Sequence, residues 1–331
     1  MIDFELVNSI EQMILIARNN IVSNINTTIV KTYYNIGKMI VEYEQKGKIK
    51  ANYGAELIKN ISKRLSDKFG RGFSVRNIEQ MRKFYIVYGK TQTLSAEFNL
   101  SWSHYLKLIR IDNPNERRFY EIEAINNQWS LRELERQFDS SLYERLVLSR
   151  DKEKIKRLSY EGQVIEGAND MIKDPYILEF IGLEELPQYS ESELEKRIID
   201  NLQSFLLELG KGFTFVGRQT RITFDEQHFR VDLVFYNRLL KAFVLIDLKR
   251  GTLKHQDIGQ MQMYVNYYDR YVKLDEENPT IGILLCADKN DTLVEITLPK
   301  DNEQIFASKY QTILPSKEEL KRLIEYRDEI I

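Results

Sequence analysis

The stretch FRVDLVFYNRLLKAFVLIDLKR, residues 229–250, decides the fold of the C-terminal half of the chain. Residues 229–236 are rich in β-branched and aromatic side chains, and residues 242–246 form a short, continuous apolar run. Two such runs joined by a few residues are typical of an antiparallel hairpin, and a continuous apolar run is typical of a strand buried on both faces. We therefore predict a hairpin whose loop spans residues 238–241.

This loop predicts a register for the hairpin. It places Tyr236 opposite Phe243 and Asp232 opposite Asp247, and directly opposed residues share a face of the sheet. Because side chains alternate along a strand, Asp247 and Lys249 also share a face. A slip of one residue would separate the two carboxylates, and the sequence by itself does not exclude that slip.

Two carboxylates and an ammonium group on one patch are suited to phosphodiester chemistry. Mg²⁺ is held by one or two carboxylates together with substrate phosphate and water, so Asp232, Asp247 and the backbone carbonyl of Leu248 are the candidate ligands of Mg²⁺ or Mn²⁺. Lys249 would position or activate the attacking water, or stabilise the developing charge. The competing interpretation is that Asp247 and Lys249 mark a solvated strand end.

The order of these segments resembles the PD-(D/E)XK nuclease superfamily: an acid on a helix, Asp on a hairpin, Asp-x-Lys, and then another helix. Gln260 and Tyr264 match the Gln-x-x-x-Tyr element of some branches of that superfamily. More narrowly, nearly the whole chain resembles the YhcG-like family of bacterial proteins. The supporting segments are residues 101–105, 127–130, 205–213, 215–219 and 282–286. The family usually has Glu where this chain has Asp247.

The resemblance implies a fold and an activity. It implies a multidomain chain with a mainly α N-terminal domain, helix-turn-helix or winged-helix-like, and an α/β restriction-endonuclease-like C-terminal domain with a mixed central sheet. The implied activity is metal-dependent hydrolysis of DNA, in repair, recombination or defence against mobile DNA. Gln260 and Tyr264 would contact the substrate backbone or support Lys249, whereas without the resemblance they are ordinary polar helix surface.

Glu195 is a further candidate for the site. It lies on a helix predicted over residues 193–209, at the margin of an apolar stripe, where a carboxylate needs a reason. The helical acid of the superfamily, a metal or water ligand, would supply one. The local alternative is a capping box opened by Ser192. Downstream, residues 254–268 predict a crossover helix that leads to a buried strand at 280–286.

The N-terminal half carries a basic excess. Residues 1–150 have a net charge of +6, residues 31–90 of +9, and residues 151–331 of −8. Ser74 is a good N-cap for a helix that presents Arg76, Asn77, Gln80 and Lys83, side chains suited to base edges and phosphates. This pattern predicts a DNA-docking helix, and the competing interpretation is an ordinary solvated helix.

Composition sets the outer limits. The 331 residues are enough for two domains, which we place at 1–155 (helical, DNA-binding) and 191–331 (nuclease), with a linker and connecting helix at 156–190. Cys286 is the single cysteine, no apolar run approaches the length of a membrane span, and the first residues lack the pattern of a signal peptide. We therefore expect a cytoplasmic protein with no membrane partner. Three histidines and one cysteine give no zinc-ligand spacing.

The sequence thus predicts a magnesium-dependent deoxyribonuclease. The first rival is a non-catalytic DNA-binding or adaptor protein that keeps the nuclease fold. The second is an RNA nuclease, which no RNA-recognition pattern supports. A homodimer would suit paired cuts on two strands. DNA sequence or structure specificity, and nicking as against double-strand cleavage, are not specified by the residues.

Overall fold

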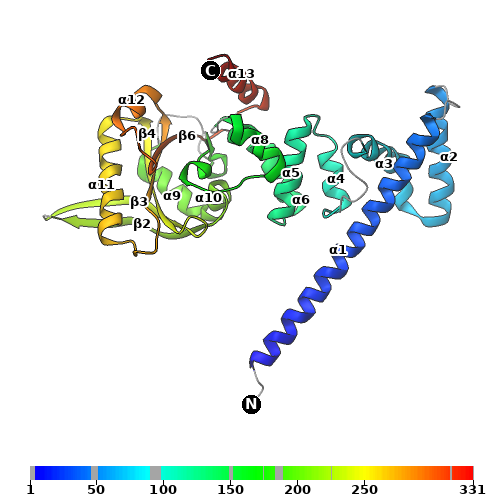
Figure 1. Cartoon of the computed structure of the whole chain (residues 1–331), viewed down its shortest axis with the longest axis horizontal. Helices are drawn as coiled ribbons and strands as arrows, with labels where there is room; N and C mark the ends of the chain where they lie inside the picture. Colours follow the sequence, from blue (N-terminus) through cyan, green and yellow to red (C-terminus); the bar gives the residue numbers. More distant parts are fainter. Residues whose placement is uncertain are drawn as a thin grey trace. The chain divides into compact units, whose positions relative to one another are not determined.

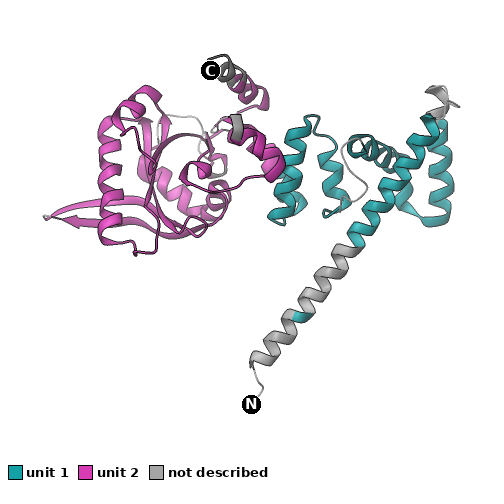
Figure 2. Ribbon diagram, viewed as in Figure 1, with its two compact units in different colours: residues 1–136 teal, residues 137–331 magenta. Residues whose placement is uncertain are grey.

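The computed structural model describes residues 4–45, 51–89, 98–148, 152–173, 175–182, 189–224, 226–313 and 315–330. The chain divides into two compact units, residues 1–136 and 137–331 (Figure 2). These compact units do not test the functional division into residues 1–155, 156–190 and 191–331, which stays a prediction. None of the helices in the described parts of the chain is long and apolar enough to cross a membrane.

The described residues of unit 1 form helices and no strands, so the helical character of the N-terminal region is confirmed and a β-wing is not seen there. The helices are α1 (Phe4–Tyr43), α2 (Ala51–Phe69), α3 (Val75–Tyr88), α4 (Trp102–Leu108) and α5 (Pro114–Asn126), followed by α6 (Leu131–Asp139), which ends in unit 2; a short 3₁₀ helix, η2 (Arg71–Phe73), precedes α3.

An aromatic cluster and a close helix crossing hold unit 1 together. The ring of Phe84 on α3 is fully buried and lies with its centroid within 5.8 Å of those of Tyr34, Tyr88, Phe98, Trp102 and Tyr105. Gly37 of α1 lies directly against α3, because a Cβ atom there would stand 2.0 Å from the Met81 carbonyl oxygen. Such ring contacts add stability beyond the area that they bury.

Unit 2 is built on a six-stranded mixed sheet in the order β1-β6-β5-β4-β3-β2 (Figure 1). Its strands are β1 (Tyr176–Ile177), β2 (Phe213–Phe224), β3 (Gln227–Asn237), β4 (Ala242–Thr252), β5 (Ile281–Asp288) and β6 (Ile305–Gln311). Strands β2, β3 and β4 are antiparallel neighbours, whereas β4, β5, β6 and β1 are parallel. The predicted hairpin, its loop and the mixed sheet are confirmed.

Helices cover both faces of this sheet. On one face, α9 (Glu191–Asp200) and α10 (Leu202–Leu209) pack Leu194, Ile198 and Phe205 onto the strands. On the other, the predicted crossover helix α11 (His255–Tyr271) packs Met261 and Val265 onto β5. Gly282 makes this contact close, since a Cβ atom there would lie 2.6 Å from Met261. The remaining helices of unit 2 are α7 (Leu142–Leu148), α8 (Lys152–Glu161), α12 (Asp291–Thr297), α13 (Lys317–Ile330) and the 3₁₀ helices η3 (Ala168–Met171) and η4 (Glu179–Ile181).

A buried ionic network ties α7 to the sheet and its helices. Arg145 is fully buried and pairs through its guanidinium group with Glu208 of α10, itself 2% exposed. The same carboxylate accepts a hydrogen bond of 3.0 Å from the backbone N–H of Ile177 on β1, and the Lys173 ammonium donates to the Glu208 carbonyl. Buried charges of this kind are tolerated only when they are paired. Residues near 145 are therefore part of the same compact unit as the sheet.

Candidate active site

The hairpin register brings the two predicted aspartates to one place. Tyr236 pairs with Phe243 and Leu233 with Ile246, as predicted, so continuing the same register sets Asp232 against Asp247. The ladder between β3 and β4 stops at Leu233, and from there the strands are joined through a side chain. Asp232 Oδ2 accepts a hydrogen bond of 2.8 Å from the backbone N–H of Leu248.

Asp247 lies under an ammonium group. Its side chain is nearly fully buried, with 3% of the residue exposed, and Lys249 Nζ lies 2.7 Å from Asp247 Oδ2. Burial, the charge of Asp232 and a hydrogen bond between the two carboxyl groups raise the pKa of Asp247 to about 7, although Lys249 opposes the shift. A buried carboxyl group whose pKa is raised by a neighbouring carboxylate is a common sign of a functional centre, because a cation would relieve the repulsion between the two groups.

Lys249 is held between carboxylates on β4 and α11. Its Nζ lies 3.8 Å from Oδ1 of Asp257, in the first turn of α11. Burial lowers the pKa of Lys249, but the negative charges of Asp247, Glu191 and Asp257 raise it by a larger amount. The net shift of the pKa is therefore upward, and the side chain stays an ammonium ion. In this arrangement Lys249 acts as a fixed positive charge.

Glu195 reaches the same cluster through Gln219. Gln219 Nε2 lies 2.6 Å from Glu195 Oε2 and 3.0 Å from Asp232 Oδ1, so one amide bridges α9 and β3. Burial and the charge of Asp232 raise the pKa of Glu195, whereas Gln219 and Arg218 lower it, and the net shift is upward. Gln219 has φ 47°, a left-handed conformation that is uncommon for a residue other than glycine.

The helix that carries Glu195 differs from the prediction. It begins at Glu191 rather than at 193 and is interrupted at Asn201, so that α9 and α10 are separate helices. The N-cap is Ser190, whose hydroxyl accepts from the N–H of Glu193 at 3.1 Å. The capping box opened by Ser192 is therefore wrong, and it no longer explains Glu195, which turns to Gln219 instead.

Gln260 and Tyr264 form a hydrogen-bonded pair one turn apart on α11. Gln260 Nε2 donates to the Tyr264 hydroxyl, which donates in turn to the Arg230 carbonyl on β3 at 2.9 Å. Tyr264 is fully buried, while Gln260 is half-buried. Burial and the charges of Asp247 and Asp232 raise the pKa of Tyr264, against Gln260 and Lys249, so this hydroxyl lies close to the acidic cluster and stays protonated.

The donor set can be tested for its fit to a divalent cation. Among the described residues, no cluster of three or more His, Cys, Asp or Glu side chains has a ready metal-binding arrangement. The two adjacent carboxylates of Asp232 and Asp247 nevertheless match the one or two that Mg²⁺ needs when phosphate and water complete its shell. The N–H and C=O of one residue in a strand face the same neighbour, so the Leu248 carbonyl points, like its N–H, toward Asp232.

The four residues predicted to dock DNA lie together on α3, but they differ in what they contact. The N-cap at Ser74 is as predicted, with its hydroxyl accepting from the Asn77 N–H at 3.3 Å. Arg76 and Lys83 are exposed, and Gln80 is half-buried. The side-chain amide of Asn77 already forms hydrogen bonds within the protein. It donates to the Gly72 carbonyl at 2.6 Å and accepts from Trp102 Nε1 at 2.9 Å.

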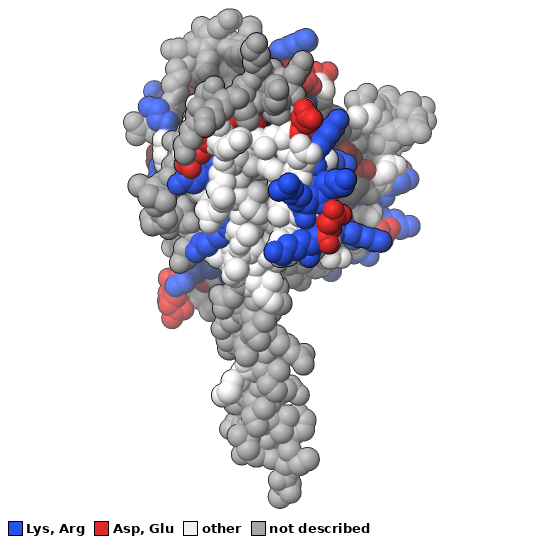
Figure 3. Space-filling model, turned by 90° about the vertical axis from the view of Figure 1, so that its right-hand side faces the viewer, with Lys and Arg blue, Asp and Glu red and all other residues white. Residues whose placement is uncertain are grey.

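Basic side chains and an apolar groove lie next to this helix. Helix α2, which contacts α3, adds exposed Lys59, Lys63, Arg64 and Lys68. Figure 3 shows Lys and Arg side chains gathered beside an uncharged stripe on this face. A groove of about 600 Å³ in the same unit is lined by apolar residues of α1 and α2, among them Ile36, Met39 and Leu65.

Two residues of the candidate site were missed in the sequence. Gln219 lies in a segment that carries the family resemblance, and Asp257 lies at the start of a predicted helix. No local pattern singles out Gln219, because it acts from a distorted point in β2. Asp257 acts from the first turn of α11. For Asp257 a signal existed, since an acid three residues after Lys254 suits the first turn of a helix.

Both halves of the chain match known protein families. Residues 169–325 match the family described as "YhcG PDDEXK nuclease domain", and residues 9–145 match "DUF1016 N-terminal domain". The chain is 39% identical over 334 residues to the Escherichia coli (strain K12) protein named "Putative nuclease YhcG", covering 92% of this chain and 88% of that relative.

Two solved structures were also found. One is a repair endonuclease from Pyrococcus abyssi, 19% identical, with a TM-score of 0.28 over 40% of this chain and 50% of that one. The other is EndoMS in its apo form, 18% identical, with a TM-score of 0.25 over 39% and 48%. Neither TM-score is high enough to assign the fold.

Proposed function

Because the chain belongs to the YhcG family, whose C-terminal region is a PD-(D/E)XK nuclease domain, we propose that it is a metal-dependent endonuclease that hydrolyses DNA. The single observation that carries this proposal is buried Asp247 next to the half-buried Asp232, with Lys249 Nζ 2.7 Å from Asp247. Membership of the family supports the class of activity, and this geometry supports the position of the active site.

Asp232, Asp247 and the Leu248 carbonyl would hold Mg²⁺ or Mn²⁺ in this proposal. Such an ion supplies an activated water and stabilises charge on the phosphoryl oxygens. Asp232 is kept in position by the Leu248 N–H and Gln219, so its carboxylate does not need to reorganise. The raised pKa of Asp247 means that this carboxyl group gives up its proton most readily when a cation replaces it.

The other residues have distinct roles in the proposal. Lys249 remains charged and stabilises the developing negative charge or orients the attacking water. Glu195 shares the Gln219 amide with Asp232 and would orient a water on the α9 side. Half-buried Gln260 would contact the substrate backbone, whereas buried Tyr264 positions β3 through the Arg230 carbonyl.

In unit 1 the proposal assigns DNA docking to α3 and its neighbours. Exposed Arg76 and Lys83, with Gln80 beside them, would bind phosphate or bases in a helix-turn-helix manner, and Asn77 would brace Trp102. The cutting domain would then be delivered to DNA in repair, recombination or defence against mobile DNA. A homodimer would allow cuts on both strands.

The deciding experiment is cleavage of supercoiled plasmid and of branched DNA with Mg²⁺ or Mn²⁺. Wild type is compared with Asp247→Asn, Lys249→Gln and the exposed control Lys241→Gln. Metal-dependent cleavage by wild type and control, lost in the other two, is the expected result. Equal cleavage by all four proteins would place the activity elsewhere. If wild type binds DNA but neither cleaves it nor binds metal in a calorimetric titration, the result would favour the non-catalytic adaptor protein.

A further inference from the structure

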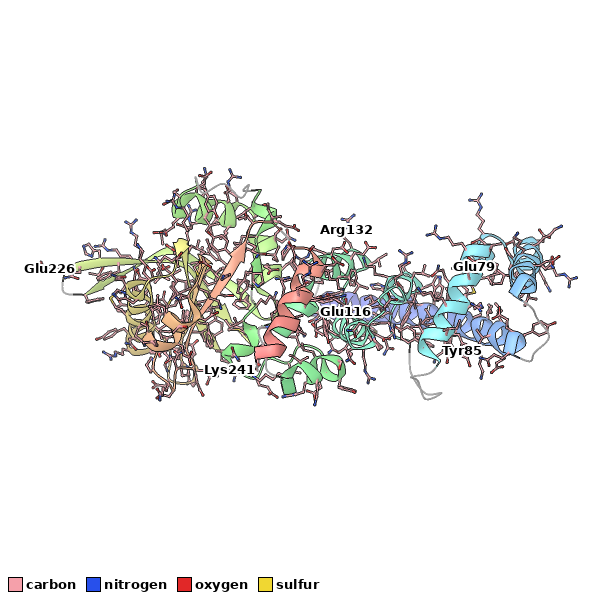
Figure 4. All side chains as sticks on the ribbon, turned by 90° about the horizontal axis from the view of Figure 1, so that it is seen from above. Glu79, Tyr85, Glu116, Arg132, Glu226 and Lys241 are labelled. Carbon is pink, nitrogen blue, oxygen red and sulfur yellow. The ribbon has the colours of Figure 1, made fainter. Side chains whose placement is uncertain are left out.

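A two-stranded ribbon extends from the sheet next to the candidate site. Strand β3 pairs with β4 only as far as Leu233, whereas β2 and β3 continue to pair out to Phe224 and Gln227. Figure 1 shows this pair of strands running on past α11, and Figure 4 places Glu226 at the outer end. The segment from Thr220 to Val231 is therefore a ribbon rather than part of the central sheet.

One face of the ribbon is anchored. Ile222 and Val231 are 1% and 0% exposed and pack in the cluster formed with α11. Farther out, the rings of Phe224 and Phe229 stack at 5.2 Å with an interplanar angle of 17°. A free two-stranded hairpin is marginally stable in water, so these contacts explain why the ribbon keeps its shape.

The opposite face carries unbalanced positive charge. Arg221 and Arg230 are directly opposed in the β2–β3 ladder, and both are exposed. Like charges in opposed positions are destabilising, and neither guanidinium group forms an ion pair with an acidic side chain of the described residues. Arg221 instead approaches Thr223 Oγ1 at 3.1 Å and the ring nitrogens of His228 at 2.7 and 2.9 Å.

This face lies beside the carboxylate cluster. Arg230 is two residues from Asp232 on β3, and Arg221 is two residues from Gln219 on β2, a separation of about 7 Å along a strand. Arg218, also exposed, lies next to Gln219 and lowers the pKa of Glu195. The Tyr264 hydroxyl binds the Arg230 carbonyl, so the backbone between the arginine and the acidic cluster is fixed.

We propose that the ribbon face formed by Arg221, His228 and Arg230, together with the neighbouring Arg218, binds the phosphate backbone of the DNA that flanks the bond to be cut. This inference rests on the proposed nuclease function and adds a substrate-binding surface to it. The opposed arginines cost stability in the free protein, and a row of phosphates would offset that cost. The ribbon would steer the strand toward Asp232 and Asp247.

The test compares the double variant Arg221→Ala/Arg230→Ala with wild type and with the control Arg238→Ala/Arg270→Ala in the full chain. The control removes two exposed arginines of the same unit elsewhere. Affinity for a fluorescein-labelled DNA duplex is measured against KCl concentration. The ribbon variant should lose about 1.8 from the slope of log K against log salt, since each phosphate contact contributes about 0.9. Its melting temperature should not fall, because a repulsion has been removed.

Cleavage by the same proteins separates this inference from the proposed function. Loss of kcat/KM in the ribbon variant alone supports the ribbon. The inference would be overturned if wild type and both variants cleave DNA at the same rate and show equal salt slopes. If wild type does not cleave, the nuclease proposal fails but the salt slope still decides the ribbon: a slope equal to that of the control rejects it.

A cross-linking measurement covers the case in which the double variant does not fold. The single cysteine, Cys286, is buried, so a photo-cross-linker attached through Glu226→Cys labels the ribbon end selectively. The same label through Arg238→Cys is the control. Cross-linking to the DNA duplex from position 226 and not from 238 is expected. Equal or absent cross-linking at 226 would contradict the inference.

Discussion

The side-chain amide of Gln219 lies 2.6 Å from Glu195, joining a distorted point of β2 to helix α9. The same amide reaches Asp232 at 3.0 Å, so one neutral side chain holds two carboxylates from different elements. Because its φ of 47° is strained for glutamine, the fold maintains this position at a cost.

Removing this amide should lower cleavage more than it lowers stability. We expect Gln219→Ala to reduce kcat by about 10- to 100-fold, as is usual for partners that orient metal-binding groups, while Gln227→Ala, an exposed control on the same hairpin, leaves kcat unchanged. Gln219→Gly should be as inactive as the alanine variant but more stable by about 1 kcal/mol, because glycine relieves the left-handed conformation. Full activity in either variant would remove Gln219 from the site.

Lys249 should be separable from metal binding. Lys249→Gln removes the ammonium beside Asp247 but leaves both aspartates, so Mg²⁺ should still raise the melting temperature while plasmid cleavage is lost. Asp232→Asn should abolish the thermal shift as well. A Lys249→Gln protein that cleaves at the wild-type rate would show that the ammonium group takes no part in the reaction. Chelation of divalent ions should abolish cleavage by wild type in the same assay.

Glu121 predicts a pH dependence for unit 1. Burial raises the pKa of this carboxyl to about 7, although Tyr88, Tyr105 and nearby arginines oppose the shift. A folded-state pKa above the unfolded value means that the group favours folding at low pH, and this contribution is lost as pH rises through about 7. Wild type should therefore lose stability between about pH 5 and pH 8 relative to Glu121→Gln.

Fluorescence makes this measurement specific. The chain has two tryptophans, Trp102 and Trp129, and both belong to unit 1. Urea unfolding followed by tryptophan emission thus reports on the unit that contains Glu121. If the difference in unfolding free energy between wild type and Glu121→Gln is the same at about pH 5 and at about pH 8, the pKa of this carboxyl group is not raised in the folded protein.

The buried pair of Arg145 and Glu208 should be costly to break and cheap to replace. Arg145→Met leaves a buried carboxylate without its partner, for a loss of about 3–5 kcal/mol in the free energy of unfolding. Arg145→Met/Glu208→Met should recover most of that loss. Circular dichroism during denaturant unfolding checks the cycle, and additive losses would mean that the two side chains are not coupled.

Asn77 and Arg76, neighbours on α3, should behave differently. Asn77→Ala removes hydrogen bonds to Gly72 and Trp102 and should destabilise unit 1 by about 1–3 kcal/mol. Arg76→Ala should leave stability unchanged but weaken DNA binding and reduce the salt slope by about 1. Unchanged DNA binding in Arg76→Ala and Lys83→Ala together would remove α3 from the docking surface.

The amino-acid sequence by itself determined the hairpin that carries the site. The apolar run 242–246 and the four-residue loop predict the register that brings Asp232, Asp247 and Lys249 near one another, and the folded sheet excludes the one-residue slip that the sequence leaves open. The crossover helix and the buried strand after it followed from their periodicity. These are local features, and local propensity and hydrophobic pattern are enough to specify them.

Only the tertiary structure decided which other side chains join them. Gln219 enters the cluster because β2 is distorted there, and Glu195 enters it through a hydrogen bond from the Gln219 amide. Neither contact is written in a local pattern. The same is true of Arg221 facing Arg230 and of Arg145 pairing with Glu208, which lie far apart or on different elements. Contacts between distant segments depend on how whole elements pack, and no short stretch of sequence encodes that.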